Sequence, residues 1–219
     1  FMFKNILFDL DGTIANSSEG ITKCAQYGLA ALGIDEPDLT KLYVVIGPPL
    51  RATYMKYWGL SEEQAELGVE KYRERYHDIG IYEQYIFPGM EALLNDLSKS
   101  DKKVGLCTGK PEVYARRIVD HFHLADYLQD ISGSTLDGKM DNKSTVVAKS
   151  LKNFNITSDE EKACTYLIGD RKEDILAAHA NGIKAIGVRF GFAVEGELEE
   201  AGADIIVDTV EDLHNLLLK

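Results

Sequence analysis

The sequence predicts an α/β protein, with a parallel sheet covered by helices on both faces and interrupted by an all-helical insert. Two patterns in the 219 residues lead to this prediction. From residue 86 onward, short apolar runs alternate with helical periodicity, as in successive β-α-β units. Residues 16–85 contain helical periodicity and no convincing strand. We therefore expect an α/β core domain of residues 1–15 and 86–219 and a helical cap domain of residues 16–85.

The first strand is expected directly before Asp9, where residues 5–13 read NILFDLDGT. An apolar run this short, bounded by a glycine, is typical of a buried strand. Side chains at i and i+2 point to the same side of a strand, so Asp9 and Asp11 could share one site at its carboxyl end. Two crowded carboxylates need a proton or a cation, and oxygen-rich sites suit Mg²⁺. The alternative is a strand followed by an Asp-Gly turn with a capping Asp.

The insert opens with helical periodicity over residues 17–32, continues with short helical segments over 39–45 and 51–58, and closes with a longer helix. Ser61 precedes that last helix, whose acidic first turn is typical of a helix N-terminus. Because the insert follows directly on the loop with the two carboxylates, we expect it to cover the site as a cap.

The rest of the core alternates helices and strands. Helices are expected over residues 91–98, 112–122, 143–153 and 171–180, strands over 103–107, 127–132, 163–168 and 184–188, and a final helix–strand–helix has its strand at 204–207.

Polar residues follow three of these later strands. Thr108 comes directly after the second strand, Lys143 begins the helix after the third, and Asp170 follows the fourth, with Asp174 one helical turn later. Each has an ordinary alternative: Thr108 as a cap, Lys143 as a solvated lysine, and the two acids as N-terminal caps. A cation at a helix start opposes the helix dipole, which favours a role for Lys143. The carboxyl ends of parallel strands share one edge, so these groups are expected near Asp9.

Together these motifs resemble those of the haloacid dehalogenase-like hydrolase superfamily, most closely its phosphoglycolate phosphatase-like branch with a helical cap after the first strand. The resemblance rests on DLDGT at 9–13, Thr108, Lys143 and Gly169-Asp170 with Asp174, and it spans essentially the whole chain. It implies a Rossmann-like core and a Mg²⁺-dependent phosphatase. The implied substrate is a small phosphomonoester, such as phosphoglycolate, a nucleotide or a sugar phosphate, cleaved through an aspartyl-phosphate.

The resemblance also implies roles for individual residues. Asp9 would be the nucleophile, and Asp11 the general acid and then the general base. Thr108 would bind a phosphoryl oxygen with help from the Gly109 backbone, and Lys143 would pair with the phosphate and the nucleophile.

A Mg²⁺ ion would be held by Asp9, the backbone carbonyl of Asp11 and Asp170, with Asp174 in support. In the cap, the loop GPPLR at 47–51 resembles the family's substrate-facing loop and makes Arg51 a candidate for contacting an anionic substrate. The alternative for Arg51 is a solvent-exposed helix arginine. Where the family usually has a second acid after the first motif, this chain has Asn16, a departure that bears on substrate choice.

The net charge, the apolar runs and the cysteines of the chain limit the kinds of molecule it is expected to bind and the compartment it is expected to occupy. A formal net charge of −12 argues against binding to nucleic acid or an anionic membrane. No apolar run approaches the ~20 residues of a membrane span, no signal peptide is visible, and three widely spaced cysteines suggest reduced thiols. We therefore expect a cytoplasmic protein, monomeric or homodimeric, whose partner is a small phosphorylated metabolite.

Other functions account for parts of this motif set, and a catalytically inactive, ligand-binding relative is disfavoured because every motif residue is present. A phosphomutase of the β-phosphoglucomutase type would use the same residues and pass the phosphoryl group to another hydroxyl. A haloacid dehalogenase would need neither Asp11 nor Asp170. A phospho-accepting receiver module, which acts by binding partners, also combines Asp, Thr and Lys on a parallel sheet but has no need of a helical cap. The phosphatase explains most of the sequence.

Overall fold

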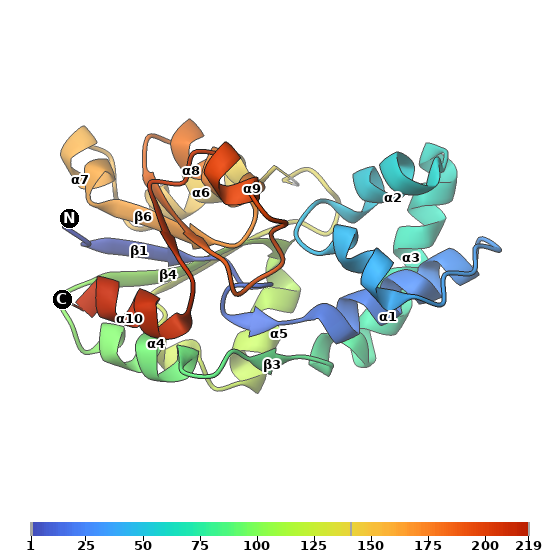
Figure 1. Cartoon of the computed structure of the whole chain (residues 1–219), viewed down its shortest axis with the longest axis horizontal. Helices are drawn as coiled ribbons and strands as arrows, with labels where there is room; N and C mark the ends of the chain where they lie inside the picture. The colour runs from blue at the N-terminus through green and yellow to red at the C-terminus, as the bar shows by residue number, and fades with distance from the viewer. Residues whose placement is uncertain (1, 141, 219) are drawn as a thin grey trace. The chain divides into compact units, whose positions relative to one another are not determined.

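The computed structural model describes residues 2–140 and 142–218, and its central element is a six-stranded parallel sheet. The strand order is β5-β4-β1-β6-β7-β8, and Figure 1 labels its three central strands, β4, β1 and β6. The strands are β1 (Asn5–Phe8), β4 (Lys103–Pro111), β5 (Asp130–Ser134), β6 (Thr165–Gly169), β7 (Lys184–Val188) and β8 (Ile205–Val207). Phe8 at the end of β1 pairs with Leu106 of β4 and Ile168 of β6, so these three strands reach the same edge together. The predicted α/β fold class is confirmed.

Helices cover both faces of this sheet. Figure 1 shows α6 and α8 on one face and α4, α5 and α10 on the other. The helices are α4 (Met90–Ser98), α5 (Glu112–His121), α6 (Lys143–Asn153), α7 (Asp159–Ala163), α8 (Lys172–Ala180), α9 (Glu197–Glu200) and α10 (Val210–Leu218), with a 3₁₀ helix at Ala125–Tyr127. A parallel sheet buried on both faces needs near-continuous apolar strands, and all four residues of β1 are buried.

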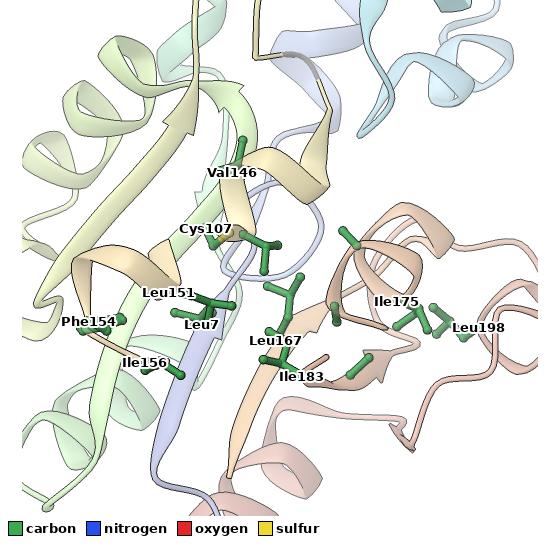
Figure 2. Close-up of a cluster of buried hydrophobic side chains, with 14 residues drawn as sticks. Leu7, Cys107, Val146, Leu151, Phe154, Ile156, Leu167, Ile175, Ile183 and Leu198 are labelled. Carbon is green, nitrogen blue, oxygen red and sulfur yellow. The ribbon is translucent and has the colours of Figure 1, made fainter. Parts of the chain in front are cut away.

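One hydrophobic cluster joins the central strands to the helices above them (Figure 2). Leu7 of β1 lies in register with Leu167 of β6, and both side chains are fully buried. Val146 and Leu151 of α6 and Ile175 of α8 belong to the same cluster. The packing of α6 and α8 against these strands places the first turns of both helices at the edge where β1 and β6 end.

The core differs from expectation at three places. Strand β4 continues to Pro111, beyond the predicted end at residue 107, because Pro111 pairs with Ser134 of β5 across an irregular register. Strand β5 begins at Asp130 because a 3₁₀ helix occupies part of the predicted run. The short helix α7 was not predicted, and the strand after it begins at Thr165.

The chain divides into two compact units, Phe1–Ala15 with Ile86–Lys219, and Asn16–Tyr85. The second unit is helical, with α1 (Ser18–Ala30), a 3₁₀ helix (Leu39–Val45), α2 (Leu50–Trp58), α3 (Glu62–Asp78) and a 3₁₀ helix (Gly80–Tyr82). Two unpredicted two-residue strands, β2 (Ala15–Asn16) and β3 (Tyr85–Ile86), pair with each other where the chain enters and leaves this unit.

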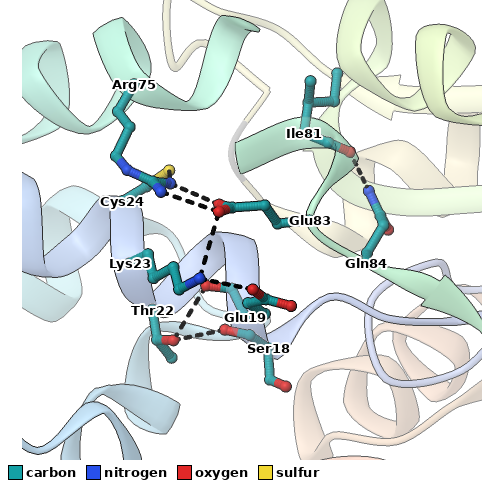
Figure 3. Close-up of polar contacts among 9 residues, drawn as sticks. All are labelled: Ser18, Glu19, Thr22, Lys23, Cys24, Arg75, Ile81, Glu83 and Gln84. Atoms are coloured by element: carbon teal, nitrogen blue, oxygen red, sulfur yellow. Dashed lines mark hydrogen bonds and ion pairs between the residues drawn. The ribbon is translucent and has the colours of Figure 1, made fainter. Parts of the chain in front are cut away.

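An ion-pair network links α1 and α3 of the helical unit to Glu83 (Figure 3). Arg75 of α3 donates two hydrogen bonds to Glu83, at 2.7 and 3.1 Å, and a third to the sulfur of Cys24 in α1 at 3.2 Å. Lys23 of α1 lies 3.5 Å from Glu83 and 2.6 Å from Glu19. The segment after α3 is thereby fixed to α1, close to where the chain leaves the unit.

Cys24, Cys107 and Cys164 are all free thiols, and the first two are buried. In the two ranges of chain that the structure describes, no helix has the length and apolar character needed to cross a membrane.

Replacing Leu7 with alanine tests the position of the hydrophobic cluster. Leu7→Ala opens a cavity under α6 and α8 and should lower the free energy of unfolding by about 3 kcal/mol. Leu176→Ala is the matched control, because Leu176 is 55% exposed and its loss should change that free energy by no more than about 0.5 kcal/mol. Urea unfolding measures both variants, and equal losses would contradict the assignment of Leu7 to the core.

Candidate active site

Three buried carboxylates meet at the carboxyl end of the two central strands. Asp9 directly follows β1, Asp170 directly follows β6, and Asp174 lies in the first turn of α8. The Asp9 backbone N–H donates to the Ile168 carbonyl at 2.8 Å, so the extended pairing continues up to the carboxylates. Each of the three contributes a carboxylate oxygen, and these atoms lie within 4.8 Å of one another.

Lys143 lies between two of these carboxylates. Its Nζ is 2.5 Å from Oδ1 of Asp9 and 2.8 Å from Oδ1 of Asp174, and its side chain is 11% exposed. Lys143 is the first residue of α6, where the helix dipole disfavours a cation. The two carboxylates offset that cost. The lysine in turn links the carboxyl end of β1 to the first turn of α8.

The site carries more negative charge than Lys143 neutralises. Burial raises the pKa of Asp9 to about 7, with Lys143 opposing the shift and Asp174 and Asp11 adding to it. Burial, followed by the charges of Asp174 and Asp9, raises the pKa of Asp170 well above its ordinary value. Burial alone would lower the pKa of Lys143, but Asp174 and Asp9 together raise it. Without a further cation, Asp9 and Asp170 can both be ionised only at a considerable electrostatic cost.

The residues at this edge fit a divalent cation. Oδ2 of Asp170 accepts a hydrogen bond from the Phe192 backbone N–H at 2.6 Å, whereas Oδ1 is buried and has no hydrogen-bond partner among the residues described. A buried carboxylate oxygen without a donor is costly unless a proton or an ion satisfies it. The side-chain atoms that could bind the cation are all carboxylate oxygens, the ligands that Mg²⁺ prefers.

Two glycines leave room for Asp170 in this arrangement. A Cβ at Gly12, whose φ is +82°, would come within 2.1 Å of Oδ2 of Asp170. A Cβ at Gly191 would lie 2.3 Å from both the Cβ of Asp170 and the carbonyl oxygen of Gly12. The loop after β7 therefore packs directly on the Asp170 carboxylate and delivers the Phe192 N–H to it.

The second aspartate of the first motif has a lysine of its own. Oδ2 of Asp11 lies 3.2 Å from Nζ of Lys110, and the two side chains are 9% and 6% exposed. Oδ1 of Asp11 is buried and has no partner in the described part of the chain. Thr108 is buried at the same strand end, and its Oγ1 accepts a hydrogen bond from the Lys110 backbone N–H at 3.2 Å. Gly109 lies between them in β4 and is partly buried.

Arg51 lies in the helical unit, in the first turn of α2. Its guanidinium is half-exposed and pairs with Glu66 of α3. Asn16 lies at the start of the same unit, where Oδ1 accepts from the N–H and the hydroxyl of Ser18 at 3.1 and 2.7 Å. Asn16 therefore holds Ser18, the first residue of α1, from a position before the helix.

Lys110, Gly191 and Phe192 were not identified from the sequence. For Lys110 a signal was present, since it comes directly after Thr108 and Gly109, at the predicted end of the second strand. For Gly191 the only signal was a glycine shortly after the end of β7, with nothing to connect it to Asp170.

Comparisons with known proteins agree with this geometry. The sequence pattern of the haloacid dehalogenase-like hydrolases matches residues 6–188. A 5'-nucleotidase of Pseudomonas aeruginosa is 41% identical over 196 residues, covering 90% of this chain and 87% of the relative. A phosphoglycolate phosphatase of Vibrio parahaemolyticus is 27% identical over 219 residues, covering 96% and 94%.

A solved structure described as a predicted phosphatase from Clostridium acetobutylicum is 38% identical, with a TM-score of 0.94 over 100% of this chain and 99% of that one. The family pattern covers most of the residues, including the first motif, Thr108, Lys143, Asp170 and Asp174. The resemblance inferred from the sequence is confirmed, and the chain belongs to the haloacid dehalogenase-like hydrolase family.

Proposed function

We propose that this protein is a Mg²⁺-dependent phosphatase that hydrolyses a small phosphomonoester through a phosphoryl group carried by Asp9. Its relatives include phosphatases, in agreement with a phosphoric monoester hydrolase. The observation that carries the proposal is the pairing of the buried Asp9 carboxylate with Lys143, 2.5 Å away, beside Asp170.

Asp9 supplies the nucleophile. One of its carboxylate oxygens attacks the phosphorus of the substrate, the bond from phosphorus to the ester oxygen breaks, and the alcohol leaves. Water then attacks the phosphorus of the aspartyl-phosphate, the bond to the Asp9 oxygen breaks, and inorganic phosphate leaves. Two displacements with a carboxylate replace one difficult hydrolysis.

Asp11 moves the proton in both steps. It gives a proton to the departing ester oxygen in the first step and takes one from the attacking water in the second. Oδ1 of Asp11 is buried and has no partner among the described residues, so it is available to give and accept this proton. That supports the role of Asp11.

Lys143, Thr108 and Gly109 would bind the phosphoryl group. Lys143 offsets negative charge on the phosphoryl oxygens and on Asp9, while the Thr108 hydroxyl and the Gly109 N–H act as hydrogen-bond donors. Phosphoryl transfer depends mainly on such positioning and charge neutralisation. A protein of net charge −12 has to concentrate that positive charge locally.

Asp9, Asp170 and the backbone carbonyl of Asp11 would hold Mg²⁺. When bound, the ion would neutralise charge on the phosphoryl oxygens and on the carboxylates. Asp174 has a supporting position, because its Oδ1 contacts Lys143 and its Oδ2 accepts from the Arg171 N–H at 3.2 Å. That engagement supports Asp174 as the residue that orients Lys143.

A nucleoside monophosphate is the substrate class we place first. The 5'-nucleotidase of Pseudomonas aeruginosa is 41% identical to this chain, against 27% for the phosphoglycolate phosphatase of Vibrio parahaemolyticus. Phosphoglycolate and sugar phosphates follow. The contact of Arg51 with an anionic substrate stays a prediction, and so does the cap role of the helical unit.

Asp9→Asn should abolish phosphate release, because an amide oxygen is a poor nucleophile and cannot form the aspartyl-phosphate. We expect a loss of at least about 10³-fold in kcat with nucleoside monophosphates, phosphoglycolate and sugar phosphates. EDTA should abolish the wild-type activity, and added Mg²⁺ should restore it. Asp101→Asn, at a 96% exposed side chain, is the control expected to keep full activity. Undiminished hydrolysis by Asp9→Asn would contradict the mechanism.

Binding of Mg²⁺ should strengthen as pH rises. The folded-state pKa of Asp9 is raised from 3.8 to about 7, and that of Asp170 is raised as well. The folded protein thus binds these protons more tightly than the unfolded chain. Without metal, the free energy of unfolding should therefore fall as pH rises from 3.8, the ordinary pKa of Asp9, to about 7. Mg²⁺ competes with the same protons.

Thermal unfolding with and without Mg²⁺, at about pH 5.5 and about pH 8, measures this competition. We expect a larger Mg²⁺-induced rise in Tm at the higher pH, and little rise at either pH in Asp170→Asn. A rise that is independent of pH, or one that survives in Asp170→Asn, would contradict the assigned metal ligands.

A further inference from the structure

We propose that Lys110 is a positioning residue that holds the Asp11 carboxyl group in the orientation needed for proton transfer. This role rests on the proposed function, because proton transfer by Asp11 matters only if the protein cleaves phosphomonoesters. It adds a second lysine to the site, distinct from Lys143 in its partner and in its task.

The two lysines serve different carboxylates. Nζ of Lys143 contacts Asp9 and Asp174, and Nζ of Lys110 lies 3.2 Å from Oδ2 of Asp11. Only 6% of the Lys110 side chain is exposed. A lysine this buried is rare unless it is paired, and the ion pair with Asp11 offsets part of the cost of burying it.

The contact makes the two oxygens of Asp11 inequivalent. Oδ2 lies 3.2 Å from the Lys110 ammonium in an ion pair, whereas Oδ1 is buried and unpartnered within the described ranges. An ammonium group can only donate hydrogen bonds, so a proton carried by Asp11 belongs on Oδ1, away from Lys110. Rotation about χ2 of an aspartate is broad, so without an anchor the plane of the carboxyl group would vary and either oxygen position could carry the proton. Lys110 selects the orientation in which Oδ1 exchanges protons with the ester oxygen and with water.

The backbone holds Lys110 in place for this contact. Strand β4 extends past Thr108 to Pro111, with an irregular register between Cys107 and Pro111. The Lys110 N–H donates to Oγ1 of Thr108 at 3.2 Å. The end of β4 that carries Thr108 therefore also fixes the backbone position of Lys110.

The competing role for Lys110 is direct binding of the phosphoryl group. A lysine bound to the phosphoryl oxygens would aid every substrate alike. A lysine that orients the proton donor matters more when the leaving oxygen is strongly basic and needs the proton. Dependence on the leaving group thus separates the two roles.

The test compares Lys110→Met with wild type, in Mg²⁺, on p-nitrophenyl phosphate and on an alkyl phosphomonoester. The parameter is kcat/KM, which reports the steps up to loss of the alcohol and excludes hydrolysis of the aspartyl-phosphate. We expect a loss of about 10²-fold with the alkyl ester. The loss with p-nitrophenyl phosphate, whose leaving group departs without a proton, should stay within about 3-fold.

Lys110→Gln is the second variant, because its amide can still donate to Oδ2 of Asp11 and should recover part of the lost activity towards the alkyl ester. Lys152→Met, at an exposed position near the end of α6, is the matched control and should behave as wild type. Thermal unfolding verifies that each variant is folded.

Equal losses on both substrates in the folded variants would overturn the role in favour of phosphoryl binding, and no loss on either would overturn it outright. If wild type hydrolysed neither ester, the proposed function would fail, and the role of Lys110 with it.

Discussion

The main physical constraint on this structure is the mutual repulsion of three carboxylates that are buried together at one edge of a parallel sheet. Asp9, Asp170 and Asp174 converge there, and burial raises the pKa values of Asp9 and Asp170. Lys143 relieves part of this repulsion by contacting Asp9 and Asp174 together. The remaining negative charge is what makes the site suitable for a divalent cation and, with it, a phosphoryl group. Stability and function thus place opposite demands on the same side chains.

The fold meets these demands through backbone placement. The parallel register brings β1, β4 and β6 to one edge, and α6 and α8 pack so that Lys143 and Asp174 begin helices at that edge. Gly12 and Gly191 then close on Asp170 with no room for a side chain. Each charged group of the site is therefore positioned by a different element of secondary structure. A small shift of one element would change the distances between its charged group and the others.

Much of this could be predicted from the sequence because the relevant signals are local. Strands β1 and β6 are short apolar runs, and Asp9 and Asp170 follow them directly, so the strand-end rule for parallel sheets was sufficient to predict their convergence. Lys110 and Gly191 were missed because their partners depend on tertiary structure. Whether Lys110 reaches Asp11 depends on β4 continuing to pair with β5, and Gly191 meets Asp170 only through the loop after β7.

Locating the phosphoryl group during turnover would be the most direct test of Asp9 as the nucleophile. Asp11→Asn is suited to this with p-nitrophenyl phosphate as substrate, because p-nitrophenolate leaves without a proton while the water step still needs a base. Acid quenching during turnover with Mg²⁺, followed by peptide mass spectrometry, should find one phosphoryl group on Asp9. A phosphoryl group on any other residue, or turnover with Asp9 unmodified throughout, would contradict the mechanism.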